Sequence, residues 1–158
     1  MSVYTAAGCT LSISNASTTD ATDTQAEFEA LTYLEVGEIQ NIGEFGDQVS
    51  KIMFTALSNR RVRKFKGSYD AGALDLTVGF DSTDTGQAQV IAARASDADW
   101  AFKVTLNDAG TGSPSSPTTF YFLGKVMART VIPGDVETVV TGRINIELNS
   151  AIIEVPAV

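Results

Sequence analysis

The sequence predicts a mostly β protein, an antiparallel β-sandwich or barrel with one α-helix. Apolar and polar residues alternate with a period of two in several segments, most clearly in 73–81. One segment, at about 85–96, instead has the alanine-rich composition that favours a helix. The connections are too short for repeated β-α-β crossovers. We therefore expect the 158 residues to form one domain, 1–158, with the helix packed outside the strands.

Seven or eight segments have the alternation and the bounding turn residues of a strand. Two segments, 15–27 and 37–48, are polar or glycine-rich, and we expect both to be flexible loops, the second overlapping the end of the predicted strand 33–42. The predicted strands are 9–14, 33–42, 49–57, 73–81, 100–108, 119–130, 138–150 and, as a short last one, 151–155.

The predicted helix begins after Asp84. An N-cap aspartate accepts a hydrogen bond from the first turn, and Gln87, three residues on, completes the pattern of a capping box. Asp84-Thr85-Gly86 is also the tripeptide of aspartic proteases, in which two copies share a proton between facing carboxylates. We favour the N-cap, because the polar residues Ser82 and Thr83 precede it where a protease has an apolar strand end.

The composition removes most catalytic and metal chemistry. The chain has no histidine and a single cysteine, Cys9, which excludes histidine-based triads, HExxH sites and cysteine zinc clusters. An acidic cluster lacks the regular spacing and the glycine of a calcium loop, so we interpret it as solvated. Its members are Asp20, Asp23, Glu27 and Glu29. We predict a non-enzymatic protein with no catalytic residue, no cofactor and no metal.

No apolar run approaches the roughly 18 residues of a membrane span, so we expect no membrane insertion.

Charge is distributed unevenly along this acidic chain, whose net charge is −8. The first 50 residues contain eight acids and no Lys or Arg. Nearly half of the cations fall in one short segment, here called the basic stretch. It comprises Arg60, Arg61, Arg63, Lys64 and Lys66.

The basic stretch has three interpretations. It could bind nucleic acid, with Phe65 stacking on a base. It could be a solvated edge strand, because lysines protect edges against aggregation. It could also be one half of an interface, and we favour this third interpretation. An acidic third and a basic patch on one chain suit head-to-tail association, which produces rings or filaments.

The run from Lys64 to Arg94, KFKGSYDAGALDLTVGFDSTDTGQAQVIAAR, resembles the major tail tube proteins of long-tailed, non-contractile bacteriophages. The resemblance lies in the order of its parts: a glycine after a basic strand, YDAG, an alternating strand that ends in Asp, and D-x-G-Q opening an Ala-rich helix. It extends over most of the chain, because GCTLSIS, VGEIQNIGEFGDQ, FKVTLND, FYFLGKV and INIELNS fall in the expected order.

The resemblance implies a structural virion protein of the phage tail, assembled in the bacterial host cytoplasm. Six subunits would form a ring, and their inner strands would join into one barrel around a channel. Rings would stack on a tape-measure protein, with tail terminator and baseplate or tip proteins at the ends. DNA would pass through without specific binding, along a lining of acidic or small polar residues. The alternative is a ring-forming tail terminator or head–tail connector, which caps a tube once.

Within such an assembly, we expect the basic stretch to face the acidic loops 15–27 and 37–48 of a neighbouring subunit. The second loop would also supply Glu44, Asp47 and two apolar side chains, Ile42 and Phe45, for a neighbour to cover. The competing interpretation is that Phe45 packs into the core of its own subunit.

Overall fold

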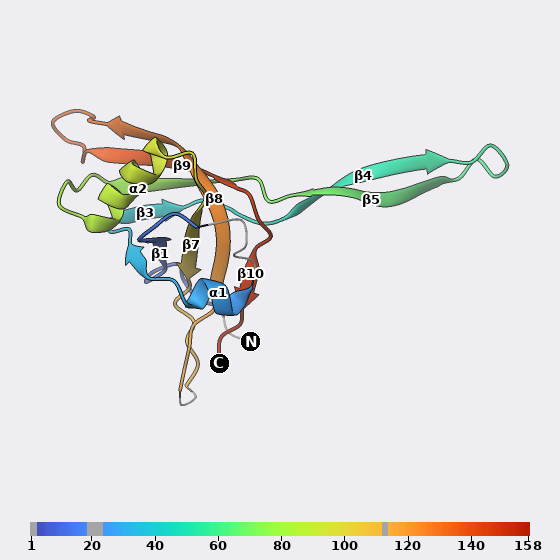
Figure 1. The fold of residues 1–158 in the computed structure, drawn as a ribbon. Helices are drawn as coiled ribbons and strands as arrows, with labels where there is room; N and C mark the ends of the chain where they lie inside the picture. The colour runs from blue at the N-terminus through green and yellow to red at the C-terminus, as the bar shows by residue number, and fades with distance from the viewer. Residues whose placement is uncertain (1–2, 19–23, 112–113) are drawn as a thin grey trace.

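The computed structural model describes residues 3–18, 24–111 and 114–158. It has a β body from which one long hairpin projects (Figure 1). The body strands are β1 (Thr10–Ser14), β2 (Tyr33–Glu35), β3 (Ile39–Ile42), β6 (Ala73–Gly79), β7 (Trp100–Thr105), β8 (Thr119–Ile132), β9 (Thr141–Leu148) and β10 (Ile153–Val155). The hairpin consists of β4 (Gln48–Thr55) and β5 (Val62–Asp70), and the helices are α1 (Gln25–Glu29) and α2 (Thr85–Ala95).

The body strands form one antiparallel sheet in the order β2-β1-β7-β8-β9-β6-β3, and β10 also pairs with β8. The long strand β8 links the two halves of this sheet. Its first half pairs with β7 over 119–124, and its second half pairs with β9 over 124–132. A β-bulge between Val126 and Ala128 follows shortly after this change of partner.

The sheet curls around its own core. Three strands separate β1 from β6 in the sheet order, yet Leu11 of β1 and Leu76 of β6 belong to one buried cluster. Helix α2 closes this cluster with Val90 and Ala93, both fully buried. The result confirms the predicted mostly β, antiparallel sandwich or barrel.

A smaller core lies on the other face of β7 and β8. Phe28 of α1 stacks on Tyr121 with 5.7 Å between ring centroids. Ala101 and Leu123 complete the buried set, and Ile153 of β10 packs against it. Helix α1 and the last strand, β10, are thus held to the central strands by apolar contact.

The N-terminus of α2 fastens the helix to the sheet. The Asp84 carboxylate accepts hydrogen bonds from the backbone N–H of Gln87 (2.8 Å) and of Gly37 (3.1 Å), which confirms the predicted N-cap. The Gln87 side chain is buried and does not complete a capping box. Its amide instead donates to the carbonyls of Gly37 (3.2 Å) and Gly79 (2.8 Å). One glutamine therefore ties the helix to the connection between β2 and β3 and to the end of β6.

Three boundary predictions were wrong. A second helix, α1, begins at Gln25 inside the predicted loop 15–27, and its N-cap Thr24 forms a full capping box with Glu27. The predicted strand 33–42 is two strands, because Glu38 adopts the left-handed φ of 57° and breaks it. The predicted loop 37–48 is reduced to 43–47, since β3 pairs with β6.

Asp20 and Asp23, two of the four members of the acidic cluster, lie outside the described residues. In the described part of the chain, no helix has the length and apolar character needed to span a membrane.

Gly86 tests the seating of α2. A methyl group added at this position would collide with the Glu35 carbonyl and lie 2.7 Å from the Val36 Cα, both of them backbone atoms that cannot turn away. We expect Gly86→Ala to lower the free energy of unfolding by about 1–3 kcal/mol, the usual cost of overpacking. Urea denaturation followed by circular dichroism measures it. Helix propensity alone predicts the opposite sign, a gain of roughly 0.5–1 kcal/mol.

Candidate assembly interface

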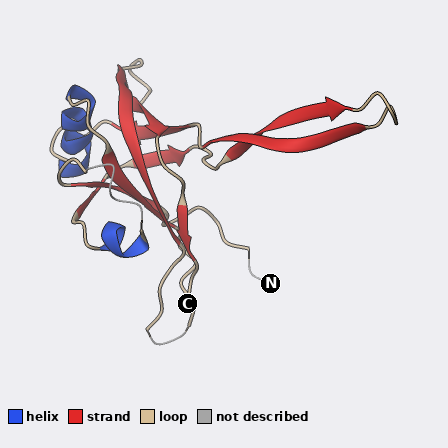
Figure 2. Ribbon diagram, turned by 45° about the vertical axis from the view of Figure 1, so that its right-hand side comes forward, coloured by secondary structure: helices blue, strands red, loops and turns tan. Residues whose placement is uncertain are grey.

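The hairpin of β4 and β5, here called the arm (Gln48–Asp70), extends away from the body. Figures 1 and 2 show it projecting as an isolated two-stranded ribbon in both views. None of its residues is buried, and only Val49, Ala56 and Gly67 are even half-buried. A two-stranded ribbon of this kind is marginally stable in water by itself. The arm therefore has the character of a segment that becomes covered in an assembly.

One face of the arm is apolar. Residues directly opposite in an antiparallel pair share a face, and β4 and β5 pair Ile52 with Phe65 and Phe54 with Arg63. Phe54 is 56% exposed and Phe65 is 53% exposed. This face therefore carries three large apolar side chains and one guanidinium in water, which is the pattern of a protein-binding surface.

The other face of the arm is cationic. It carries Lys51 directly opposite Lys66, and Lys64 opposite Met53. Like charges in directly opposed positions destabilise a ribbon, and an anionic neighbour would relieve them. The remaining cations, Arg60 and Arg61, lie at the turn, where Arg60 adopts the left-handed φ of 53°. The structure thus brings the basic stretch together on one projecting element.

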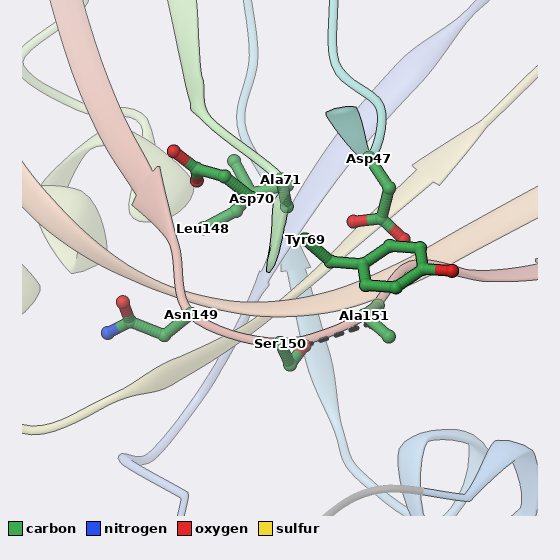
Figure 3. A pocket seen from close by; sticks show the side chains of 8 residues that line it. All are labelled: Asp47, Tyr69, Asp70, Ala71, Leu148, Asn149, Ser150 and Ala151. Atoms are coloured by element: carbon green, nitrogen blue, oxygen red, sulfur yellow. Dashed lines mark hydrogen bonds between the residues drawn. The ribbon is translucent and has the colours of Figure 1, made fainter. Parts of the chain in front are cut away.

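A hollow with a volume of about 530 Å³ lies where the arm joins the body (Figure 3). Asp47 and Tyr69 stand beside each other on its wall, and Asp70 and Asn149 also line it. The Asp70 carboxylate is engaged locally, since it accepts a hydrogen bond from the Gly72 N–H at 2.8 Å. The acidic residue Asp47 is therefore at the root of the arm, whereas the cations lie along its length and at its turn.

The loop residues expected at an interface are divided by the structure. Glu44 and Asp47 are exposed, but Ile42 and Phe45 pack against the main core of their own subunit. The Phe45 ring contacts Phe120 edge-on, with centroids 5.2 Å apart. The structure therefore favours the competing interpretation of Phe45, and a role for it between subunits stays a prediction.

Several edges of the body sheet have no partner strand in the described chain, and two of them flank the strands β6 and β9. Strand β3 pairs with β6 alone. The second half of β8, 125–132, pairs with β9 on one side only, because β7 ends its pairing at Gly124. These edges could not be predicted from local sequence pattern, because they depend on the order of the strands in the sheet. The apolar face of the arm could not be predicted for a different reason. The alternation of its residues is the same as that of an ordinary strand with one face in a core.

Within the described residues, no three Cys, Asp or Glu side chains gather where they could hold a metal ion.

No protein-family model matches the chain, and no curated protein matches it by sequence. Solved structures do resemble it. One is of an extracellular contractile injection system, the PVC sheath/tube terminator in the extended state, with 12% identity, a TM-score of 0.69 and coverage of 98% of both chains. Another is the anti-feeding prophage (AFP) tube-terminating cap, with 11% identity, a TM-score of 0.67 and coverage of 99% of this chain and 94% of that one.

A third similar structure is the SPP1 tail tube, with 14% identity and a TM-score of 0.63. The match covers 92% of this chain and 75% of the SPP1 chain. At these identities the similarity shows the fold, which is that of tail tube and terminator proteins.

Phe45 distinguishes a core role from an interface role. Because its ring packs against Phe120 and Phe122, we expect Phe45→Ala to lower the free energy of unfolding by about 3 kcal/mol, the low end for a phenylalanine removed from a core. Phe54→Ala on the arm is the matched control and should change it by less than about 0.5 kcal/mol. An unchanged unfolding midpoint for Phe45→Ala, together with weaker self-association, would instead support a role for Phe45 in the interface between subunits.

Proposed function

We propose that this protein is a ring-forming structural subunit of a phage-type tail tube and has no enzymatic role. The observation that carries the proposal is the pair of unpaired edges on one four-stranded part of the sheet, β3-β6-β9-β8. Pairing β3 of one subunit with 125–132 of the next would continue the sheet around a ring, and a closed barrel removes exposed edges altogether. A head-to-tail contact of this type forms a closed ring when the rotation between neighbours is a whole fraction of 360°. The resemblance to phage tail tube proteins suggests six subunits.

One face of this four-stranded part is suited to line a channel. Every second residue of β6 and β9 is buried, and the residues between them are small or polar. These are Ala73, Asp75, Thr77 and Gly79 of β6, and Thr141, Arg143, Asn145 and Glu147 of β9. Of the two acids on this face, Asp75 accepts a hydrogen bond from Asn145 at 2.8 Å. Lys125 of the neighbouring β8 lies directly opposite Glu147, but its ammonium group is ion-paired with Asp99 at 3.2 Å. Arg143 is the cation that β9 contributes to this face.

The proposed lining is therefore polar and only weakly acidic, with two acids and one cation on β6 and β9, and is less acidic than the surface that DNA passage favours most simply. It still offers no continuous cationic surface to hold phosphates. In this proposal the tube belongs to a virion tail assembled in the host cytoplasm, and DNA moves through it. The tube would be built on a tape-measure protein and end at terminator and baseplate or tip proteins.

A tail terminator or cap is the second candidate function. The observation that favours it is that two of the similar structures, the PVC sheath/tube terminator and the AFP tube-terminating cap, match this chain over 98–99% of its length. A terminator closes a tube once and does not stack on itself.

Electron microscopy of the purified protein over a range of concentrations separates these functions. A tube subunit should form stacked rings that lengthen into polytubes as concentration rises, because its two stacking faces are complementary. Single rings at every concentration would support the terminator. Particles that remain monomeric at all concentrations, with the fold intact by circular dichroism, would contradict both.

A further inference from the structure

A second exposed apolar surface lies at the turn between β8 and β9. The segment 131–140, here called the distal loop, is exposed at every residue, and the Val136 side chain is fully accessible to solvent. Its exposed apolar residues are Val131, Ile132, Val136, Val139 and Val140. Apolar side chains gathered in this way mark a surface that binds protein.

The distal loop is held in one shape by its own hydrogen bonds. The Asp135 N–H donates to the Thr138 hydroxyl at 2.7 Å, and the Glu137 N–H donates to the Asp135 carboxylate at 3.0 Å. Gly134 has a φ of 71°, and a side chain there would collide with Thr138. The loop is also fixed to β6, because the Phe80 N–H donates to the Val140 carbonyl at 2.9 Å. A preformed loop loses little conformational entropy when a partner covers it.

The distal loop and the arm are complementary in charge. The loop carries two acids, Asp135 and Glu137, and no Lys or Arg. On the apolar face of the arm the charged residue is Arg63, two further cations, Arg60 and Arg61, lie at its turn, and its first acid is Asp70 at the root. Both surfaces combine exposed apolar side chains with charge, and the charges are opposite. Complementary charge of this kind orients partners and excludes the wrong ones.

The two surfaces cannot meet within one molecule. Strands β6 and β9 pair Ala73 with Glu147 at the end where the arm joins, and Gly79 with Thr141 at the end where the distal loop begins. The arm and the distal loop therefore lie at opposite ends of the same strands. Figure 1 shows the arm and the β8–β9 turn on opposite sides of the body. Two complementary surfaces at opposite ends of a subunit produce head-to-tail stacking.

We propose that the arm of one copy covers the distal loop of a second copy in the next layer of the assembly, an inference that rests on the proposed tube function. The apolar face of the arm, with Ile52, Phe54 and Phe65, covers the valines of the loop. Arg63 shares that face and therefore meets Glu137. The opposite face, with Lys64, turns away from the loop.

Disulfide cross-linking of mixed single-cysteine variants tests the contact. In a Cys9→Ser parent, Phe65→Cys subunits are mixed with Val136→Cys subunits, assembled and oxidised. The matched control replaces Val136→Cys with Ala151→Cys, which lies in the hollow at the root of the arm. We expect the Phe65–Val136 product to form at least about tenfold faster than the Phe65–Ala151 product, because a docked pair has a much higher effective concentration.

Charge exchange tests the orientation of the arm. Arg63→Glu and Glu137→Lys should each impair stacking alone, since each places like charges together. Mixed together they should stack again in alternation, because the reversed arm of one fits the reversed loop of the other. Lys64→Glu, on the opposite face, should stack like the parent protein.

The outcomes separate this inference from the function on which it rests. Tubes that form without the Phe65–Val136 product, faster cross-linking to Ala151, or equal loss of stacking in Arg63→Glu and Lys64→Glu would overturn the arm-to-loop contact and leave the tube function standing. A Cys9→Ser parent that forms neither rings nor tubes would overturn the proposed function as well.

Discussion

Each subunit has backbone and side-chain groups that it cannot satisfy alone, and this constraint connects the parts of the structure. The core of the body is closed, because α2 and the curled sheet bury its apolar residues. The edges at β3 and at the second half of β8 are unpaired among the described strands, and the arm has no core beneath it. An open edge pairs with another strand when one is offered. The chain therefore has a closed core of its own, but its surface keeps unpaired strand edges and an uncovered arm.

The body and the arm have separate roles in the proposed assembly: the body keeps a fixed shape, and the arm makes contact with another copy. The body is held rigid by contacts such as the Gln87 amide on the Gly37 and Gly79 carbonyls, which fix the angle between the ends of the sheet. A fixed angle is needed if many copies are to close a ring with the same rotation at each contact. The arm and the distal loop lie at the two ends of the β6 and β9 strands, so in the proposed assembly a change in either stacking surface would leave the core undisturbed.

The fold class and the helix cap could be predicted from the sequence because both depend on local pattern. Period-two alternation identifies β6 and β7, and an aspartate before a helix-forming run identifies the cap at Asp84. The destination of Phe45 could not be predicted, since a glycine-flanked aromatic looks the same whether its own core or a neighbour covers it. The unpaired edges depend on the order of the strands in the sheet, and the two faces of the arm depend on β4 pairing with β5 without a core beneath them. The pattern within a single strand shows neither.

Amide hydrogen exchange, measured on the dilute monomer and on the assembled protein, tests most directly whether subunits complete one another. An unpaired edge amide exchanges freely, whereas one in a ladder is protected until the ladder opens. If neighbouring subunits pair edge to edge, amides in 39–42 and in 125–132 become protected together on assembly, and those of the arm become protected as rings stack. Assembly that leaves exchange at both edge strands unchanged would contradict the account.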